Sequence, residues 1–547
     1  MTCRLAGTST VPRQLDVDAE RTKCLALTTA FVLLRSRDVN ERGWFDVDEG
    51  TRLRPVLWRL RLAGYSERSV LARLGLRDLC DLRIRAAPMY RAERLMARDP
   101  LDVAIDVFLL ERAVSSHELA RLFGDEDVAL LVRAGVLMLE PSGDARARAS
   151  LFPVDGHLVF SDHAAPDLFD DDCAEAPADQ VMFVGADSRW LARATVRRAV
   201  DASLDLCTGS GVQALLASGH SRRVVATDLN PRAVRCARFN AAAAGVTNLD
   251  VLIGDLYAPV RGQRFDLITA NPPFVPSPVD SLAFRDGGPS GEDVVKRVVA
   301  GVPEHLAPGG VAQVVTELGE RDGEPLVDRL RAWVGGAPLD IHVLRLRAHS
   351  AADYAMGHAR GATAGALLDS ADAWAGNLRA QGYSRVVAIL AGFRWSDASV
   401  GDPWNRVDDS APPSRAAGAE IEDRFAAQRR MCDPRIGPGG QRVTLRRADP
   451  IAVQHARVLG YDVPTSTTAT RLGRALAVEH PIVPLEAALL ERLTGDVDLA
   501  QLLALARGSE LSEESVLDAI RSLVGRGLVT FADDTLPRAS ESCECNV

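Results

Sequence analysis

Short apolar runs alternate with amphipathic stretches through the middle of the chain, from about residue 182 to 396. Seven of the runs have the length of buried strands: Ser203–Leu206, Arg223–Thr227, Leu249–Ile253, Phe265–Thr269, Val311–Thr316, Asp340–Leu346 and Arg385–Ala391. Strands that alternate with helices are typical of a mostly parallel sheet covered on both faces. The pattern therefore predicts a seven-stranded, Rossmann-like α/β domain over 180–398. The helical stretch Arg347–Tyr383 lies between the last two strands and is expected to be an insertion.

The region before this domain has helical periodicity. Residues 1–97 are expected to form a helical N-terminal region. Residues 98–165 are predicted to contain three helices and a hairpin, an arrangement typical of a winged helix. The predicted elements of this unit are Leu101–Leu110, Ser115–Phe123, Asp127–Ala134, and a hairpin of Ala149–Phe152 with His157–Phe160.

A similar unit is predicted after the central domain. Residues 399–440 are rich in Pro, Gly, Arg and Asp, as expected of a linker. Residues 441–534 return to helical periodicity and end in a strand that starts at Gly527, so a second winged-helix-like unit is expected there. Its three predicted helices are Leu485–Leu493, Leu499–Ala506 and Ser515–Arg526.

Composition limits the function classes. The net charge of −10 and the pI of about 5.6 argue against a broad surface for nucleic-acid phosphates, although a local basic groove is compatible with them. Nine cysteines without a CxxC pair indicate reduced thiols in a cytoplasmic protein and no metal site. The apolar stretch Cys24–Leu34 is too short to span a bilayer, so a buried helix and no membrane contact are expected.

The first two predicted strands end in residues that suit a nucleotide-like ligand. Gly209 and Gly211 follow the first strand and open a helix, whose free N–H groups suit an anionic or carboxylate group. Asp228 ends the second strand, where an acid can accept from ribose hydroxyls, or can instead cap the helix that begins at Asn230-Pro231. After the third strand, Asp255 could accept from an adenine amino group or be an ordinary loop acid.

The fourth strand is followed by Asn271-Pro272-Pro273-Phe274. The two prolines fix the chain after Asn271, and Phe274 supplies a flat apolar face. Such an arrangement suits a planar –NH2 group, whose hydrogens the carbonyl oxygens would accept. The alternative is a purely structural turn. Because all four elements follow strands in order, they are expected to meet at the carboxyl edge of the sheet.

At these motifs the sequence resembles the class I S-adenosylmethionine (SAM)-dependent methyltransferases. DLCTGSG, ATDLNPRAVRCARFN, GDLY and NPPF resemble the motifs of the release-factor glutamine and adenine-N6 methyltransferase subgroup. The stretches Phe284–Arg297 and His305–Gly310 resemble its continuation, and the layout resembles large bacterial members with added terminal domains.

The resemblance implies SAM as cofactor and a role for each motif residue. The cofactor would contact Asp205, Cys207, Gly209, Gly211, Asp228, Asn230, Asp255 and Leu256. The acceptor would contact the catalytic residues Asn271, Pro272, Pro273 and Phe274. Cys207 stands where these loops usually have glycine, which places cofactor affinity and chemistry in question.

Three functions are compatible with the sequence. The first is methyl transfer to a nitrogen of a protein glutamine, a small amine or a nucleic-acid base, with a protein partner bound through the terminal domains. The second is a non-methyl reaction of natural-product metabolism, such as ring closure or elimination, which Cys207 and the insertion suggest. The third is a SAM-sensing transcription factor, but the candidate recognition helix Ser115–Phe123 carries only Arg121 beside His117 and Glu118.

Some residues outside the motifs could also meet a substrate. Tyr354 and His358 lie at helical spacing in the insertion, which could cover the site. Arg193, Arg197 and Arg198 precede the first strand and could meet an acidic substrate, or could form a solvated face.

Overall fold

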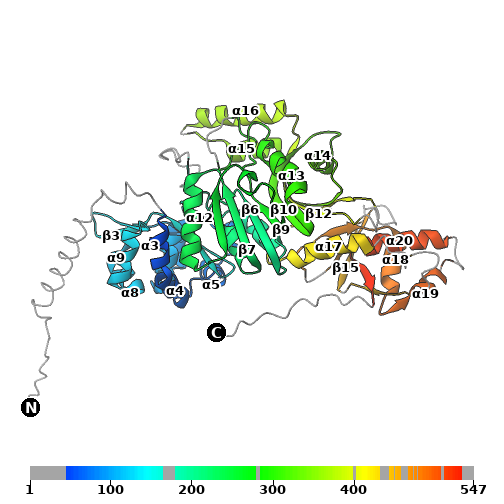
Figure 1. Ribbon diagram of the computed structural model, residues 1–547, viewed down its shortest axis with the longest axis horizontal. Coiled ribbons are helices and arrows are strands. Elements are labelled where there is room, and N and C mark those ends of the chain that lie inside the picture. The colour runs from blue at the N-terminus through cyan, green and yellow to red at the C-terminus, as the bar shows by residue number, and fades with distance from the viewer. Residues whose placement is uncertain are drawn as a thin grey trace, which may run out of the picture.

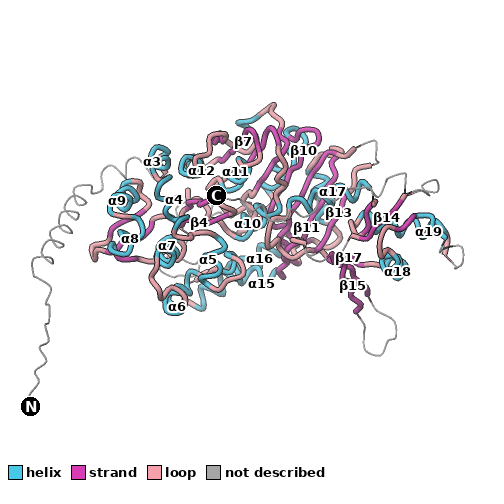
Figure 2. Tube along the Cα trace, turned by 90° about the horizontal axis from the view of Figure 1, so that it is seen from below, coloured by secondary structure: helices cyan, strands magenta, loops and turns pink. Residues whose placement is uncertain are grey.

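The computed structural model arranges the chain in three parts, which follow one another along its longest axis (Figure 1). An N-terminal helical part, the central sheet and a C-terminal part keep this order when seen from below (Figure 2). The structure describes residues 45–532 except for 164–178, 279–283, 362, 398–401, 431–435, 437–442, 449, 457–465, 472–473, 477, 505 and 507–510. The predicted helix Cys24–Leu34 lies outside the described residues.

The central sheet confirms the predicted α/β fold but has eight strands where seven are predicted. Its order is β13-β11-β12-β10-β9-β6-β7-β8. Strands β8, β7, β6, β9 and β10 are mutually parallel, and β12 is antiparallel to both β10 and β11. The strand bounds are β6 Val200–Leu206, β7 Ser221–Asp228, β8 Leu249–Ile253, β9 Phe265–Ala270, β10 Leu306–Glu320, β11 Leu339–Ser350, β12 Arg385–Trp395 and β13 Asn405–Asp409.

Alternating side chains along each strand bury both faces of this sheet. On β7, Val225 packs in the apolar cluster of α13, whereas Val224 and Ala226 pack with α11 and α12. This two-residue period is the strand repeat, and it explains why the parallel strands read as nearly continuous apolar runs. The covering helices are α10 Ala186–Ala194, α11 Val212–Ser218, α12 Pro231–Ala244, α13 Asp293–His305, α14 Leu326–Trp333 and α17 Gly418–Arg430.

The segment predicted as a linker, 399–440, contains β13 and α17, so the prediction is wrong for those residues. β13 is an edge strand of mostly polar residues that pairs in parallel with β11, and it lacks the apolar run by which strands are found. α17 buries Ile421 and Phe425, one turn apart, against the sheet. The low apolar content of both elements explains why sequence periodicity misses them.

The N-terminal part contains the three helices and the hairpin predicted for 98–165. They are α7 Pro100–Phe108, α8 Ser116–Phe123 and α9 Asp125–Arg133, with the hairpin β4 Ser150–Val154 and β5 His157–Ser161. A three-stranded sheet, β1-β3-β2, accompanies the helices, with β1 Val114–Ser115, β2 Leu137–Leu139 and β3 Asp144–Ala147. Within the described residues, which begin at residue 45, four further helices precede them: α3 Val47–Arg52, α4 Arg54–Leu62, α5 Glu67–Leu74 and α6 Ala87–Glu93, with 3-10 turns at Leu79–Asp81 and Ile84–Ala86.

A buried amide joins this part to the sheet domain. Asn240 of α12 accepts from the backbone N–H of Phe160 at 2.9 Å and donates to the Phe160 and Ser210 carbonyls at 2.7 and 2.8 Å. One side chain thus connects the hairpin, α12 and the loop after β6. Each of these buried polar groups is paired, as stability requires.

The C-terminal part contains three helices close to the predicted ones, α18 Pro484–Arg492, α19 Leu499–Ala504 and α20 Glu513–Gly525. Its sheet has the order β18-β14-β19 and is made of β14 Thr444–Arg447, β18 Val497–Asp498 and β19 Val529–Phe531. The middle strand precedes the helices here, whereas the middle strand β3 follows them in the N-terminal unit. A second sheet contains β15 Ile451–Ala456, β16 Ser466–Arg471 and β17 Glu479–Pro481.

The insertion forms α15 (Ala351–His358) and α16 (Ala364–Ala380), which lie above the sheet in Figure 1. β11 runs in the direction of β10, so α15 starts at the carboxyl edge of the sheet. Tyr354 and Trp374 pack there with Val275 and Phe274. The insertion therefore covers the loop after β9. No helix among the described residues is long and apolar enough to span a bilayer.

Replacing Phe425 with Ala is expected to lower the free energy of unfolding by about 3–5 kcal/mol, because the buried ring would leave a cavity between α17 and the sheet. Denaturant titration of the central domain measures the change. Leu368→Ala, at a side chain that is 59% exposed, is the matched control and should change stability by less than about 0.5 kcal/mol. Equal losses for both variants would contradict the packing of α17.

Candidate active site

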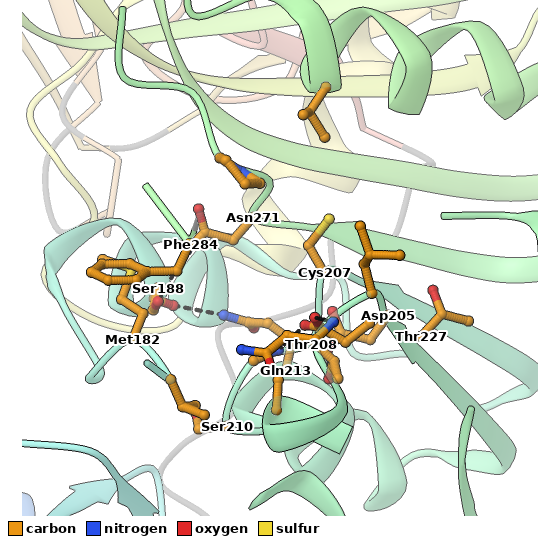
Figure 3. A pocket seen from close by; sticks show the side chains of 18 of the residues that line it. Met182, Ser188, Asp205, Cys207, Thr208, Ser210, Gln213, Thr227, Asn271 and Phe284 are labelled. Atoms are coloured by element: carbon orange, nitrogen blue, oxygen red, sulfur yellow. Dashed lines mark hydrogen bonds between the residues drawn. The ribbon is translucent and has the colours of Figure 1, made fainter. Parts of the chain in front are cut away.

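A cavity of about 490 Å³ lies at the carboxyl edge of β6, β7 and β9. Its walls come from the loops after these strands and after β8, from the segment before α10, and from the start of α13 (Figure 3). Nine of the predicted site residues line it: Asp205, Cys207, Gly209, Asp228, Asn230, Asp255, Leu256, Asn271 and Pro273. The order of strands thus brings together side chains that are separated by up to 68 positions along the chain.

The two glycines of the loop after β6 have different tasks. Gly211 caps α11 with φ 83°, and a Cβ there would lie 2.9 Å from the Ala237 side chain, so close helix packing requires glycine. Gly209 has φ 55°, and a Cβ there would meet no described atom within 4 Å. Gly209 therefore leaves open space at the cavity wall, whereas Gly211 lies behind the wall.

Asp205 is buried and joins three elements around the cavity. Its carboxylate accepts from the hydroxyls of Thr208 at 2.5 Å and Thr269 at 2.8 Å, and from the backbone of Ala214. Burial raises the pKa of Asp205 to about 7, although these hydrogen bonds oppose the rise. Asp205 therefore braces the loop after β6 against β9 and α11.

Asp228 is held at the end of β7 by backbone donors. Its carboxylate accepts from Gly209 N–H at 2.8 Å and from Asn230 N–H at 2.9 Å. Burial raises its pKa. The helix cap is Asn230, whose side chain accepts from Arg232 N–H at 2.9 Å. Asp228 is therefore not the N-cap of α12, and its oriented carboxylate lines the cavity.

Cys207 has a left-handed backbone with φ 54°. A non-glycine residue in this region costs about 1–2 kcal/mol, which explains the usual preference for glycine at this position. The side chain packs against the apolar cluster of Val225 and Ile268. Burial, together with the carboxylates of Asp228 and Asp205, raises the pKa of the thiol well above its usual value. The raised pKa favours the neutral thiol over the nucleophilic thiolate.

The loop after β8 forms another wall. Leu256 is buried with φ 48°, and Thr227 donates to its carbonyl at 2.9 Å. Asp255 is half-exposed and forms an ion pair with Arg297 of α13. Leu256 thus presents an apolar surface to the cavity, and beside it lies the Asp255 carboxylate, which already pairs with Arg297.

Asn271 follows β9 with a fixed side-chain amide. Its Nδ2 donates to Asp187 Oδ2 at 2.9 Å and to Ser188 Oγ at 3.0 Å. Both partners belong to the first turn of α10, and burial raises the pKa of Asp187. Because the NH2 group faces these two acceptors, Oδ1 is oriented away from them and can accept a hydrogen bond.

Pro272 and Phe274 do not line the cavity, unlike Asn271 and Pro273. Phe274 turns into the cluster below the insertion, and its N–H donates to the Arg285 carbonyl at 3.1 Å. The returning segment instead places Phe284 at the cavity wall (Figure 3). The flat apolar face expected from Phe274 is thus supplied by Phe284.

Sequence reasoning assigned no role to several lining residues. The segment before α10 contributes Met182 and Phe183, α10 itself contributes Ser188, and the segment after β9 contributes Phe284 and Asp286. The Phe284–Arg297 stretch carried a signal, since it resembles the family pattern. No sequence signal marks Met182 and Phe183, because two apolar residues before a helix are common in proteins and do not indicate a site.

A second buried acid lies near Asp187. Glu317 accepts from the Tyr354 hydroxyl at 2.6 Å, and burial raises its pKa to about 7. Tyr354 also stacks on His358, with ring centroids 4.1 Å apart. Tyr354 and His358 do not line the cavity, and Tyr354 packs instead with Val275 and Phe274. Among the described residues no group of three or more His, Cys, Asp or Glu could hold a metal ion.

Comparison with known proteins identifies the central region. Residues 184–326 match the family model of the methyltransferase small domain. The ribosomal protein uL3 glutamine methyltransferase of Bradyrhizobium diazoefficiens is 41% identical over 144 residues, which cover 24% of this chain and 44% of that protein. The release factor glutamine methyltransferase of Moorella thermoacetica is 37% identical over 142 residues, which cover 23% of this chain and 49% of that protein.

These curated relatives are matched over about half of their own length. Among solved structures, the ribosomal protein L11 methylase of Lactobacillus delbrueckii subsp. bulgaricus has a TM-score of 0.23 and 18% identity, and covers 39% of this chain and 78% of that chain. The family match includes every predicted site residue. The class I methyltransferase type is thus confirmed for this region, and the family implies SAM as the methyl donor.

The cavity fits this donor. Its volume is within the range of small-molecule sites, about 300–1,000 Å³. It combines the open wall at Gly209, the oriented carboxylate of Asp228 and the apolar surface of Leu256. These features suit, in turn, an amino-acid chain, a ribose diol and a flat base.

Replacing Asp205 with Asn is expected to change how stability depends on pH. Since burial raises the pKa of Asp205 to about 7, the folded state binds this proton more tightly than the unfolded state. The contribution of Asp205 to stability is therefore present at low pH and is lost as pH rises from about 4 to about 7. The difference in unfolding temperature, D205N minus wild type, should therefore increase as the pH rises over that range.

Thermal unfolding followed by circular dichroism across pH measures this difference. Asp201→Asn, at an exposed residue of the same strand, is the control and should run parallel to wild type. A D205N curve that also runs parallel to wild type would contradict the raised pKa.

Proposed function

We propose that this protein transfers a methyl group from SAM to the side-chain amide nitrogen of a glutamine in a protein acceptor. The observation that supports this most directly is the fixed amide of Asn271 at the cavity wall. Its NH2 group donates hydrogen bonds to Asp187 and Ser188. Its Oδ1 therefore remains to accept a hydrogen bond from the methyl acceptor. A glutamine amide has two such hydrogens and is planar.

The task of these residues in methyl transfer would be to orient the acceptor amide. SAM, when bound, supplies a methyl group activated by its sulfonium. Asn271 Oδ1 would accept one amide hydrogen and turn the nitrogen towards the cavity, and Pro272 and Pro273 would restrict the backbone around it. Phe284 would lie against the planar amide. Orienting the two reactants in this way lowers the activation barrier substantially, and methyl transfer from a sulfonium requires no strong acid or base.

The relatives support the acceptor class. The two curated relatives described above are named as a ribosomal protein uL3 glutamine methyltransferase and a release factor glutamine methyltransferase. The matches cover 24% and 23% of this chain, and the family model that matches residues 184–326 includes the site but not the terminal parts. The proposal therefore takes the reaction from the shared region and leaves the particular acceptor protein to experiment.

We also propose that the terminal units, which have winged-helix-like element orders, bind protein and not DNA. A winged helix places its third helix in the major groove, which is α9 in the first unit and α20 in the second. The candidate expected from the sequence, Ser115–Phe123, corresponds instead to α8, the second helix of the first unit. The first turn of α9 carries Asp125, Glu126 and Asp127, and that of α20 carries Glu513 and Glu514. Acids at these positions would repel phosphates.

Asn271→Ala is expected to reduce the rate of methyl transfer about 100-fold or more, because the acceptor amide loses its oriented partner. The assay incubates the purified protein with SAM and with release factor or ribosomal protein uL3, and detects methylglutamine by mass spectrometry. Affinity for S-adenosylhomocysteine should stay within about twofold of wild type, since Asn271 would contact the acceptor only. Unchanged turnover would contradict the acceptor site.

Asp228→Ala is expected to weaken binding of S-adenosylhomocysteine at least about tenfold, because it removes the proposed ribose acceptor and releases Gly209. Calorimetric titration measures the dissociation constant. Asp250→Ala, at an exposed acid on β8, is the matched control and should bind as wild type does. Equal affinity for D228A and wild type would overturn the assignment of the ribose site.

A further inference from the structure

A second cavity, of about 620 Å³, lies between the N-terminal part and α10. Its walls come from the start of α5, the turn between β4 and β5, one side of α10, and residues 414–416. None of its lining residues lines the methyltransferase cavity. The two cavities are therefore separate sites.

Positive charge dominates this second cavity. Six arginines line it: Arg68, Arg77, Arg189, Arg193, Arg197 and Arg415. The lining includes only two carboxylates, Glu67 and Asp155. Glu67 is shared between Arg189 at 3.2 Å and Arg193 at 3.0 Å, and Asp155 pairs with Arg197. Arg68 and Arg77 form no ion pair with any residue that the structure describes.

Arg189 provides a second, independent observation. Its side chain is 2% exposed, and its Nη2 has no hydrogen-bond partner among the described residues. Its guanidinium lies over the Phe152 ring, 5.9 Å from the centroid. A buried guanidinium that shares its carboxylate partner Glu67 with Arg193 costs free energy, and the negative charge of an anion in the adjacent cavity would offset part of this cost.

We propose that this cavity binds a small phosphate-bearing molecule of about nucleotide size. Guanidinium groups recognise phosphate oxygens through paired, charge-assisted hydrogen bonds. Its size fits a small molecule, whereas nucleic acid would need an extended basic surface that a chain of net charge −10 does not favour. Phosphate oxygens would accept from the exposed Arg68 and Arg77, and the buried positive charge of Arg189 would add to the attraction.

α10 separates this site from the methyltransferase site. Asp187 and Ser188 on one side of the helix hold Asn271, while Arg189, Ala192 and Arg193 on the other side line the second cavity. Residues at positions i, i+3 and i+4 share a helix face, so the arginine face follows from the spacing. The proposal does not depend on the identity of the methyl acceptor.

Calorimetric titration of the full chain with inorganic phosphate, pyrophosphate and ADP tests the proposal. Saturating S-adenosylhomocysteine is kept present, so that the methyltransferase cavity is closed to these anions. The test variant is Arg68→Ala with Arg77→Ala, two exposed positions. The matched control is Arg133→Ala with Arg222→Ala, which removes the same charge from exposed positions outside the cavity.

We expect at least one anion to bind wild type and the control with one-to-one stoichiometry, and to bind the test variant at least about tenfold more weakly. Binding of S-adenosylhomocysteine should be equal in all three proteins, which shows that each is folded. Comparable affinities for pyrophosphate and ADP would identify a site for the phosphate group alone, and tighter ADP binding would identify a nucleotide site. No binding of any of the three anions, or equal binding to the test variant and the control, would overturn the proposal.

Discussion

The arrangement of the site depends on the buried carboxyl of Asp205. It receives hydrogen bonds from Thr208 in the loop after β6, from Thr269 near the end of β9, and from the backbone of α11. Thr208 precedes Gly209, and Thr269 lies two residues before Asn271. One acid thus sets the position of the cofactor loop relative to the acceptor strand, and its pKa of about 7 shows the cost of burying it there.

α10 relates the N-terminal part of the protein to the reaction site. Its first turn holds the amide of Asn271, while Arg193 on its other side contacts Glu67 and Asp78 of the N-terminal part. The hairpin reaches the cofactor loop separately through Asn240. The N-terminal helices are therefore packed against the elements that carry the site, as expected if they position an acceptor protein.

Cys207 has a strained backbone, and the raised pKa of its thiol disfavours the reactive thiolate. The residue adopts a left-handed backbone that glycine would adopt at lower cost, and Leu256 in the loop after β8 does the same. The loop keeps its shape because Asp228 holds the N–H of Gly209 and the Cys207 side chain packs in the core. The departure from the usual glycine pattern therefore leaves the cavity open.

The sequence by itself determined the α/β alternation, the first seven strands and nine of the residues that line the cavity. It could do so because the motif residues follow buried strands, and parallel strands end at one edge. It could not show that Asn230, and not Asp228, caps α12, that Phe284 replaces Phe274 at the wall, or that Asp187 fixes Asn271. It also missed β13 and α17, whose apolar residues are few. These features depend on contacts between segments distant along the chain, and only the packed tertiary structure decides which side chains meet.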